Sequence, residues 1–242
     1  MTDALAHLLF FYVTFLVPWF GRFKYRQLQD QVAAGVHDAR CHFYRRTIAQ
    51  QGALAMAVFL IWRLGAVPSD ALGLVAPISG KAATNSLILL FLAIAVSIVL
   101  VRYKGDRQFK RLQRMAGALL PTSVSERWWF AAISLGAGIS EELVCRGFLL
   151  FYLNAYAHGL GVWKMIIISS LIFGLGHLYQ GWLGVLGGTA LGFCFALLYL
   201  GSGSLLVPAT VHAAVDLRII AILTPERVKS LQNATRAACA AR

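Results

Sequence analysis

Residues 128–153 of the chain read WWFAAISLGAGISEELVCRGFLLFYL, an apolar run with three charged residues at its centre, Glu141, Glu142 and Arg146. At about 1.5 Å per helical residue, this run is long enough to cross the roughly 30 Å hydrocarbon core of a bilayer with some tilt. Glu141 then lies near the midplane, where inserting a charged side chain costs at least about 2.5 kcal/mol. Because spanning a membrane requires no such residues, the charges indicate a functional site.

Helical spacing separates the three charged residues. Glu142 and Arg146 are four positions apart on one helix face, so we expect them to pair and to act as a scaffold. Glu141 is rotated about 100° away from Glu142 and has no local counter-ion, which makes it the candidate functional carboxyl. The alternative is that all three form a structural polar cluster that ties helices together.

The composition predicts an integral membrane protein. The chain is 59% hydrophobic and 13% charged, whereas about a quarter of the residues of a soluble domain are charged. The net charge of +12 comes mostly from Lys and Arg in loops beside apolar spans, as the positive-inside rule expects, so we expect no nucleic acid as a partner. The four cysteines lack disulfide or zinc spacing and fit a reduced compartment.

Apolar spans run through most of the chain and predict an all-α, polytopic bundle of transmembrane helices. Seven spans cover about residues 5–20, 52–67, 87–103, 128–153, 162–178, 181–200 and 205–223. The short apolar piece 71–79 adds an eighth membrane helix if it re-enters the bilayer. With no internal repeat and no composition break, we expect residues 1–242 to form a single integral membrane domain.

Loop charge predicts the orientation. Six basic residues lie between the first two spans and six between the third and fourth, whereas the segment between the second and third offers only Lys81. With seven spans, the N-terminus then lies outside and both basic loops and the C-terminus lie in the cytoplasm, in what we expect to be a bacterial inner membrane.

Two loops and one span leave structural details to be decided. The sequence of residues 104–127 is compatible with an amphipathic helix on the membrane surface, ending before Pro121. It is equally compatible with a solvated basic loop that fixes the topology. The loop 21–51 predicts either a helical hairpin or irregular polar chain. In the sixth span we expect a small-residue face that lets another helix pack closely, made by Gly181, Gly184, Gly187, Gly188 and Gly192.

Two later spans carry polar groups that Glu141 lacks locally. His177 lies at the end of the fifth span, and His212 and Asp216 are four positions apart on one face of the seventh. Each signal alone is compatible with a structural hydrogen bond. Together they suggest that Glu141, His177, His212 and Asp216 surround one water-accessible cavity.

The motifs Glu141-Glu142-xxx-Arg146, Phe173-xxx-His177 and His212-xxx-Asp216 resemble, in this order, those of the CAAX protease and bacteriocin-processing family. This is the type II CAAX prenyl endopeptidase group of glutamic intramembrane proteases, and the resemblance covers about residues 119–223, the expected catalytic core. It implies that Glu141 and His177 activate a water and that His212 and Asp216 stabilise the oxyanion, with Glu142 and Arg146 in support. Members carry Asn or Asp at the position of Asp216, and the eukaryotic prenyl-protein enzymes use Asn. Asp216 therefore weakens the analogy with the substrates of the eukaryotic enzymes more than it weakens the resemblance to the family.

These motifs favour an intramembrane endopeptidase that cuts a membrane-associated protein or peptide without a cofactor. A metal-dependent membrane protease is one alternative, because Glu141, His177, His212 and Asp216 are acceptable zinc ligands, although the chain lacks a His-Glu-x-x-His helix. A non-catalytic scaffold, bacteriocin-immunity protein or transporter is another. The sequence leaves open the identity of the substrate, its prenylation and the oligomeric state.

Overall fold

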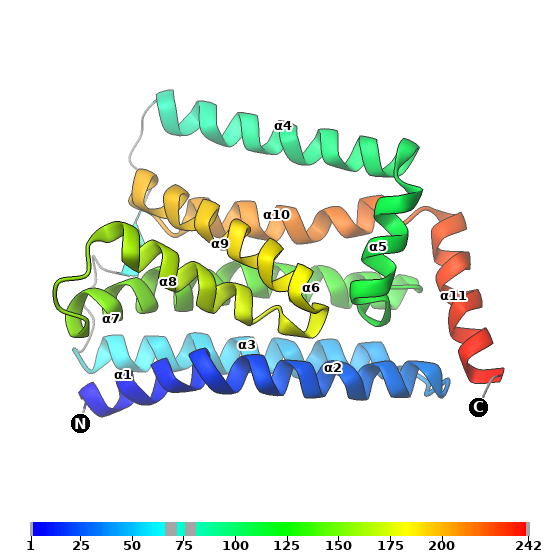
Figure 1. The fold of residues 1–242 in the computed structure, drawn as a ribbon, viewed down its shortest axis with the longest axis horizontal. Helices are drawn as coiled ribbons and strands as arrows, with labels where there is room; N and C mark the ends of the chain where they lie inside the picture. Colours follow the sequence, from blue (N-terminus) through cyan, green and yellow to red (C-terminus); the bar gives the residue numbers. More distant parts are fainter. Residues whose placement is uncertain (1, 66–71, 76–80, 241–242) are drawn as a thin grey trace.

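The computed structural model describes residues 2–65, 72–75 and 81–240. Helices and the turns between them account for these residues, and no β-strand occurs among them. The all-α prediction is therefore confirmed for the described part of the chain. Figure 1 shows the α5 and α11 helices and the turn between α2 and α3 at one end of the bundle, and the N-terminus and the α7–α8 connection at the other.

The first helix extends well beyond the predicted first span. α1 (Thr2–Phe11), the π-helical turn η1 (Tyr12–Leu16) and α2 (Val17–Ala33) follow one another without a break. After a turn at residues 34–38, α3 (Ala39–Arg63) returns beside them, and Tyr25 and Leu28 of α2 form a buried cluster with Ala39 of α3. The helical-hairpin interpretation of the loop 21–51 is confirmed, and the alternative of irregular polar chain is wrong.

The second basic loop also folds as a helix over part of its length. α4 (Lys81–Lys104) leads directly into α5 (Asp106–Ala116), which is followed by the short 3₁₀ turn η3 (Gly117–Leu119). Phe109 of α5 is buried with Leu120, Ile222, Leu223 and Leu231. The amphipathic helix expected before Pro121 is confirmed, and its position on a membrane surface stays a prediction.

The charged apolar run forms one long helix with an irregular centre. α6 (Val124–Glu142) begins at a capping box, in which Ser123 Oγ accepts from the Glu126 N–H at 3.2 Å and Glu126 Oε2 accepts from the Ser123 N–H at 3.3 Å. The π-helical segment η4 (Leu143–Phe148) and α7 (Leu149–Tyr156) continue it. π-Helical turns inside α-helices occur frequently at functional sites, and this one follows immediately after Glu141 and Glu142.

Glycines bring the next two helices into close contact. α8 (Val162–Leu175) and α9 (Trp182–Ser202) are joined by the 3₁₀ turn η5 (Leu178–Gln180). A Cβ at Gly192 would lie 3.2 Å from Ser170 Cα, and one at Gly184 would lie 2.8 Å from the His177 carbonyl oxygen. The small-residue face against α8 is confirmed for Gly188 and Gly192, whereas Gly184 packs against the turn between α8 and α9. A Cβ at Gly187 would meet nothing within 4 Å, and Gly181 lies in the turn before α9, where its φ of 77° favours glycine.

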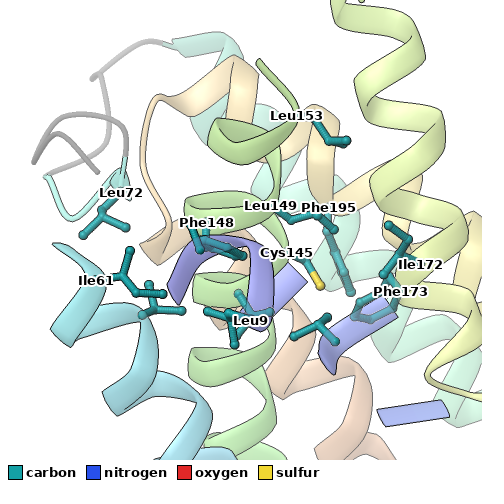
Figure 2. Close-up of a cluster of buried hydrophobic side chains, with 14 of the residues drawn as sticks. Leu9, Ile61, Leu72, Cys145, Phe148, Leu149, Leu153, Ile172, Phe173 and Phe195 are labelled. Carbon is teal, nitrogen blue, oxygen red and sulfur yellow. The ribbon is translucent and has the colours of Figure 1, made fainter. Parts of the chain in front are cut away.

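The final helices are α10 (Leu206–Ile222) and α11 (Pro225–Ala240). α6 packs against both α3 and α10 (Figure 1), and the largest cluster of buried apolar side chains surrounds its continuation through η4 and α7 (Figure 2). Members of this cluster include Leu9, Ile61, Phe148, Phe173, Phe195 and Val211. The helix that carries the charged motif is therefore held from several sides.

Some helices are long and apolar enough to cross a membrane. Among the described residues these are Asp3–Ala33 and Trp182–Ser202, and the pair Leu206–Ile222 and Pro225–Asn233, bent by 82°, adds a third if it is one span. The total of seven or eight membrane helices stays a prediction. Of the predicted short element 71–79, only residues 72–75 are described, and Gly73 O accepts a hydrogen bond from the Leu205 N–H at 2.8 Å.

Candidate active site

The residues singled out from the sequence come from three parts of the fold. Glu141 and Glu142 end α6, and Arg146 lies in η4. His177 follows the C-terminal end of α8. His212 and Asp216 lie one turn apart on α10. Contacts between side chains bring these three parts together in one place.

Glu142 and Arg146 form a fully buried ion pair within this site. Arg146 Nη1 donates to Glu142 Oε1 at 3.0 Å, and both side chains have 0% exposure. Arg146 Nη2 donates to the Gly192 carbonyl oxygen of α9 at 2.6 Å. The predicted pairing of Glu142 with Arg146 is confirmed. Because a buried ion pair loses its hydration, the contact to Gly192 satisfies part of the guanidinium that water would otherwise satisfy.

The same carboxylate holds the histidine of α10. Glu142 Oε1 lies 2.8 Å from His212 Nδ1 and accepts a hydrogen bond from it. Gly138, one turn before Glu142, allows this approach, because a Cβ there would lie 2.6 Å from the Ala209 carbonyl oxygen of α10. The sequence interpretation paired Glu142 with Arg146 alone and named His212 only with Asp216. It missed the Glu142–His212 contact, which no spacing along the chain could reveal.

The other ring nitrogen of His212 faces the two remaining carboxylates. His212 Nε2 lies 3.9 Å from Glu141 Oε2 and 3.8 Å from Asp216 Oδ2. With Nδ1 donating to Glu142, the ring presents Nε2 to these groups, as an acceptor when it is neutral and as a donor when it is protonated. The imidazole therefore connects a buried support on one side with two candidate reactive groups on the other.

Exposure separates these groups into two layers. The side chains of Glu141 and Asp216 are 37% and 40% exposed, whereas that of His212 is 5% exposed. Carboxylates that are to meet a water and a substrate must be reachable, and groups that orient them gain from exclusion of water. Glu141 and Asp216 fit the first condition, and the buried Glu142 and Arg146 fit the second.

Two phenylalanines pack against the histidines. The Phe173 ring lies 5.0 Å from the His177 ring and 5.6 Å from the His212 ring, centroid to centroid. Phe195 stacks on His212 at 4.9 Å with an interplanar angle of 18°. The Arg146 guanidinium lies 4.8 Å from the Phe173 centroid and 5.5 Å from that of Phe195. The sequence interpretation named Phe173 only as part of a motif and missed Phe195.

His177 is fixed by its own helix. Its Nδ1 lies 3.0 Å from the Phe173 carbonyl oxygen, so this nitrogen donates and Nε2 remains as the acceptor of the neutral ring. Gly188 of α9 leaves room for the ring, because a Cβ there would lie 3.0 Å from His177 Nδ1. In the described structure no hydrogen bond or ion pair joins His177 to Glu141, although His177 interacts electrostatically with both His212 and Asp216.

The four candidate catalytic residues also served above as a possible set of zinc ligands. Among the described residues, no three His, Cys, Asp or Glu side chains are grouped as ligands of one metal ion. His212 uses Nδ1 for Glu142, and its Nε2 lies 3.8 and 3.9 Å from two carboxylate oxygens. The mechanism proposed below proceeds through these side chains and includes no metal step.

Residues 123–218 match the family model described as type II CAAX prenyl endopeptidase Rce1-like. The matched stretch begins at the cap of α6 and ends in α10, so it contains all six residues discussed above. No curated protein and no solved structure matches the chain.

Proposed function

Because residues 123–218 form a domain of the type II CAAX prenyl endopeptidase Rce1-like family, we propose that this protein is an intramembrane endopeptidase. Members of this family are peptide hydrolases of membranes. Its proposed substrate is a membrane-associated protein or peptide. The resemblance seen in the three motifs is thereby confirmed as a family relationship for this stretch of the chain. The roles of individual residues are our proposal.

Glu141 and His177 are the proposed general bases. A water held between them gives a proton to this pair, and its oxygen attacks the carbonyl carbon of the scissile peptide bond. Support comes from Glu141, which is partly exposed, and from His177 Nε2, which is left as an acceptor by the hydrogen bond of Nδ1 to Phe173. The proton then passes to the leaving amide nitrogen, the C–N bond breaks, and a carboxylate and an amine are released.

His212 and Asp216 are the proposed stabilisers of the tetrahedral oxyanion. In its protonated form His212 can donate from Nε2, the atom that faces Glu141 and Asp216. Loss of one oxyanion donor typically costs about 10²- to 10³-fold in rate. Glu142, itself paired with Arg146, orients the ring from the opposite side.

One observation carries the proposal most directly. A single imidazole, His212, is held at Nδ1 by a buried carboxylate at 2.8 Å and presents Nε2 to two accessible carboxylates at 3.8 and 3.9 Å. A purely structural cluster would not need two carboxylates that remain exposed at 37% and 40%. The arrangement therefore supports hydrolysis over the scaffold and immunity-protein alternatives.

The test compares peptide termini in membrane and secreted fractions from cells carrying the wild type, Glu141→Ala or His177→Ala, with the three proteins equally abundant. We expect at least one terminus that depends on the wild type, which would also identify the substrate. Identical profiles under conditions of full expression would refute proteolysis and favour a scaffold.

The proposed location is the bacterial inner membrane, with the N-terminus outside and the C-terminus in the cytoplasm. The exposed arginines of α2 and α5 support this orientation, because α5 and the α2–α3 turn lie at the same end of the bundle (Figure 1). A C-terminal fluorescent protein that matures only in the cytoplasm tests it. Fluorescence is expected, and its absence from a fusion inserted at normal abundance would reverse the assignment.

A further inference from the structure

A basic cavity of about 880 Å³ lies beside the candidate active site, in a position that none of the sequence motifs indicated. Its walls come from α2, α5 and the connection between α8 and α9. The five arginines that line it are Arg22, Arg26, Arg107, Arg111 and Arg114. Among the described residues that line this arginine pocket, none is acidic.

The arginines face the pocket because of their helical spacing. Arg22 and Arg26 are one turn apart on α2, and Arg107, Arg111 and Arg114 follow one another at four and three positions on α5. The other side of α5 is held by burial of Phe109. The pocket therefore gathers positive charge from two helices that are far apart in the sequence.

Hydrogen bonds from the N-terminal hairpin fix this wall. The Tyr25 hydroxyl, which lines the pocket, donates to the Met115 carbonyl oxygen at 3.3 Å. Arg40 Nε donates to the Ala118 carbonyl oxygen at 2.9 Å, and the Tyr44 hydroxyl donates to that of Leu119 at 2.6 Å. The turn after α5 is thus tied to α2 and α3, and the arginines of α5 are presented from a supported helix.

Tyr179 connects the pocket to the catalytic residues. It lines the pocket, and its ring lies 5.3 Å from that of Tyr25 and stacks against that of His177 at 6.1 Å. Its hydroxyl interacts electrostatically with Asp216 and Glu141. A group bound among the arginines would therefore lie next to a substrate bound at the proposed site.

We propose that the arginine pocket binds carboxylates of the substrate, so that the preferred substrate is a membrane-associated peptide with an acidic segment flanking the scissile bond. This inference rests on the proposed endopeptidase function. Guanidinium groups bind carboxylates in bidentate geometry, and a volume of about 880 Å³ accommodates a peptide segment. Direct contact of Tyr179 with His177 favours a substrate over a lipid headgroup as the occupant, because a lipid would need no link to the catalytic residues.

The experiment measures binding without turnover. The full-length chain carrying Glu141→Gln is placed in nanodiscs of phosphatidylcholine and titrated with two fluorescent peptides. Both share one apolar segment, followed by a run of glutamates in the first and of glutamines in the second. We expect the glutamate peptide to bind about tenfold more tightly, with an advantage that shrinks as salt is raised.

Two matched sets of substitutions locate the effect. Arg107→Gln, Arg111→Gln and Arg114→Gln together should weaken binding of the glutamate peptide about tenfold and leave the glutamine peptide unchanged. The control set, Lys110→Gln, Lys164→Gln and Lys229→Gln, removes the same charge from exposed positions outside the pocket and should change neither. Unchanged melting temperatures would show that both sets fold.

Three results would overturn the proposal: equal binding of the two peptides, an equal loss in the control set, or full displacement of the glutamate peptide by phosphatidylglycerol at native membrane content. The last would make the pocket a site for an anionic lipid. Binding is measured in a Glu141→Gln background, so failure of the pocket proposal can be distinguished from failure of the protease proposal. The comparison of peptide termini decides the protease proposal.

Discussion

Glu142 Oε1 and His212 Nδ1 lie 2.8 Å apart, although their residues are 70 positions apart in the chain. The same oxygen accepts a hydrogen bond from Arg146 at 3.0 Å. One buried carboxylate therefore neutralises a buried cation and orients the imidazole that faces Glu141 and Asp216. This double role distinguishes Glu142 from its neighbour Glu141, and it leads to the first predictions.

Replacing Glu142 should affect stability and activity by separable routes. Glu142→Leu leaves the fully buried Arg146 without its counter-ion, which typically destabilises a protein by about 3 kcal/mol. Adding Arg146→Met removes the unpaired charge and should restore most of the stability. Activity should stay about 10²-fold lower in both variants, because Nδ1 of His212 has lost its acceptor. Thermal unfolding in detergent and peptide cleavage measure the two effects.

Recovery of activity along with stability in the double variant would mean that Glu142 supports only the fold. In the proposed mechanism Glu142 is a positioning residue, so activity and stability should respond differently to the double substitution.

Glu141 should behave in the opposite way. Its side chain is 37% exposed, and among the described residues it makes an ion pair of 3.9 Å with His212 and no hydrogen bond. Glu141→Ala should therefore change the free energy of unfolding by less than about 1 kcal/mol. Cleavage should nevertheless be abolished, because the proposed general base is gone. Unfolding temperature and cleavage of the identified substrate are measured on the same preparation. Detectable cleavage at the wild-type rate would remove Glu141 from the mechanism.

Gly188 should be required for the position of His177. In Gly188→Ala the new Cβ would lie 3.0 Å from His177 Nδ1 and 3.1 Å from Gly174 Cα, so the ring and the adjoining helix must shift. We expect activity to fall about tenfold or more, since small misplacements of catalytic groups are costly. The matched control is Gly187→Ala on the same helix, where the Cβ would meet nothing within 4 Å. Equal activities of the two variants would contradict the proposed constraint on His177.

Metal chelation should leave the enzyme active. The described His, Cys, Asp and Glu side chains include no group arranged around one metal ion, and the mechanism proceeds through Glu141, His177 and His212. Incubation with a strong zinc chelator, followed by dialysis, should leave the cleavage rate within about twofold of the untreated rate. Loss of activity that returns on adding stoichiometric zinc would establish the metal-dependent alternative instead.

Asp216 should tolerate an amide better than an alkyl group. Its Oδ2 lies 3.8 Å from His212 Nε2, and its side chain is 40% exposed, so a substrate can reach it. Asn retains a side-chain donor and acceptor at the same place, so Asp216→Asn should keep at least tenfold more activity than Asp216→Ala. Cleavage rates measured at equal protein abundance test this order. Equal losses in the two variants would show that the charge of Asp216, which both substitutions remove, is what the reaction needs.

Several local features could be predicted from the sequence because they depend only on backbone periodicity. The apolar run 128–153 predicts a long helix, and the four-residue spacing predicts the ion pair of Glu142 with Arg146, which the structure has at 3.0 Å. The small-residue pattern of residues 181–192 likewise predicts a closely packed face, and the structure shows which of those glycines make it. The resemblance to the family whose model matches residues 123–218 came from three motifs, each confined to a few residues.

Contacts between distant helices were decided by the tertiary structure alone. Glu142 reaches His212 because Gly138 lets α6 approach α10, and Phe195 stacks on that histidine because α9 packs beside α10. The arginine pocket combines residues near positions 22 and 107, which no repeat in the chain relates. The physical reason is the same in each case: helical periodicity fixes which residues share a face, but close packing of the helices decides which faces meet.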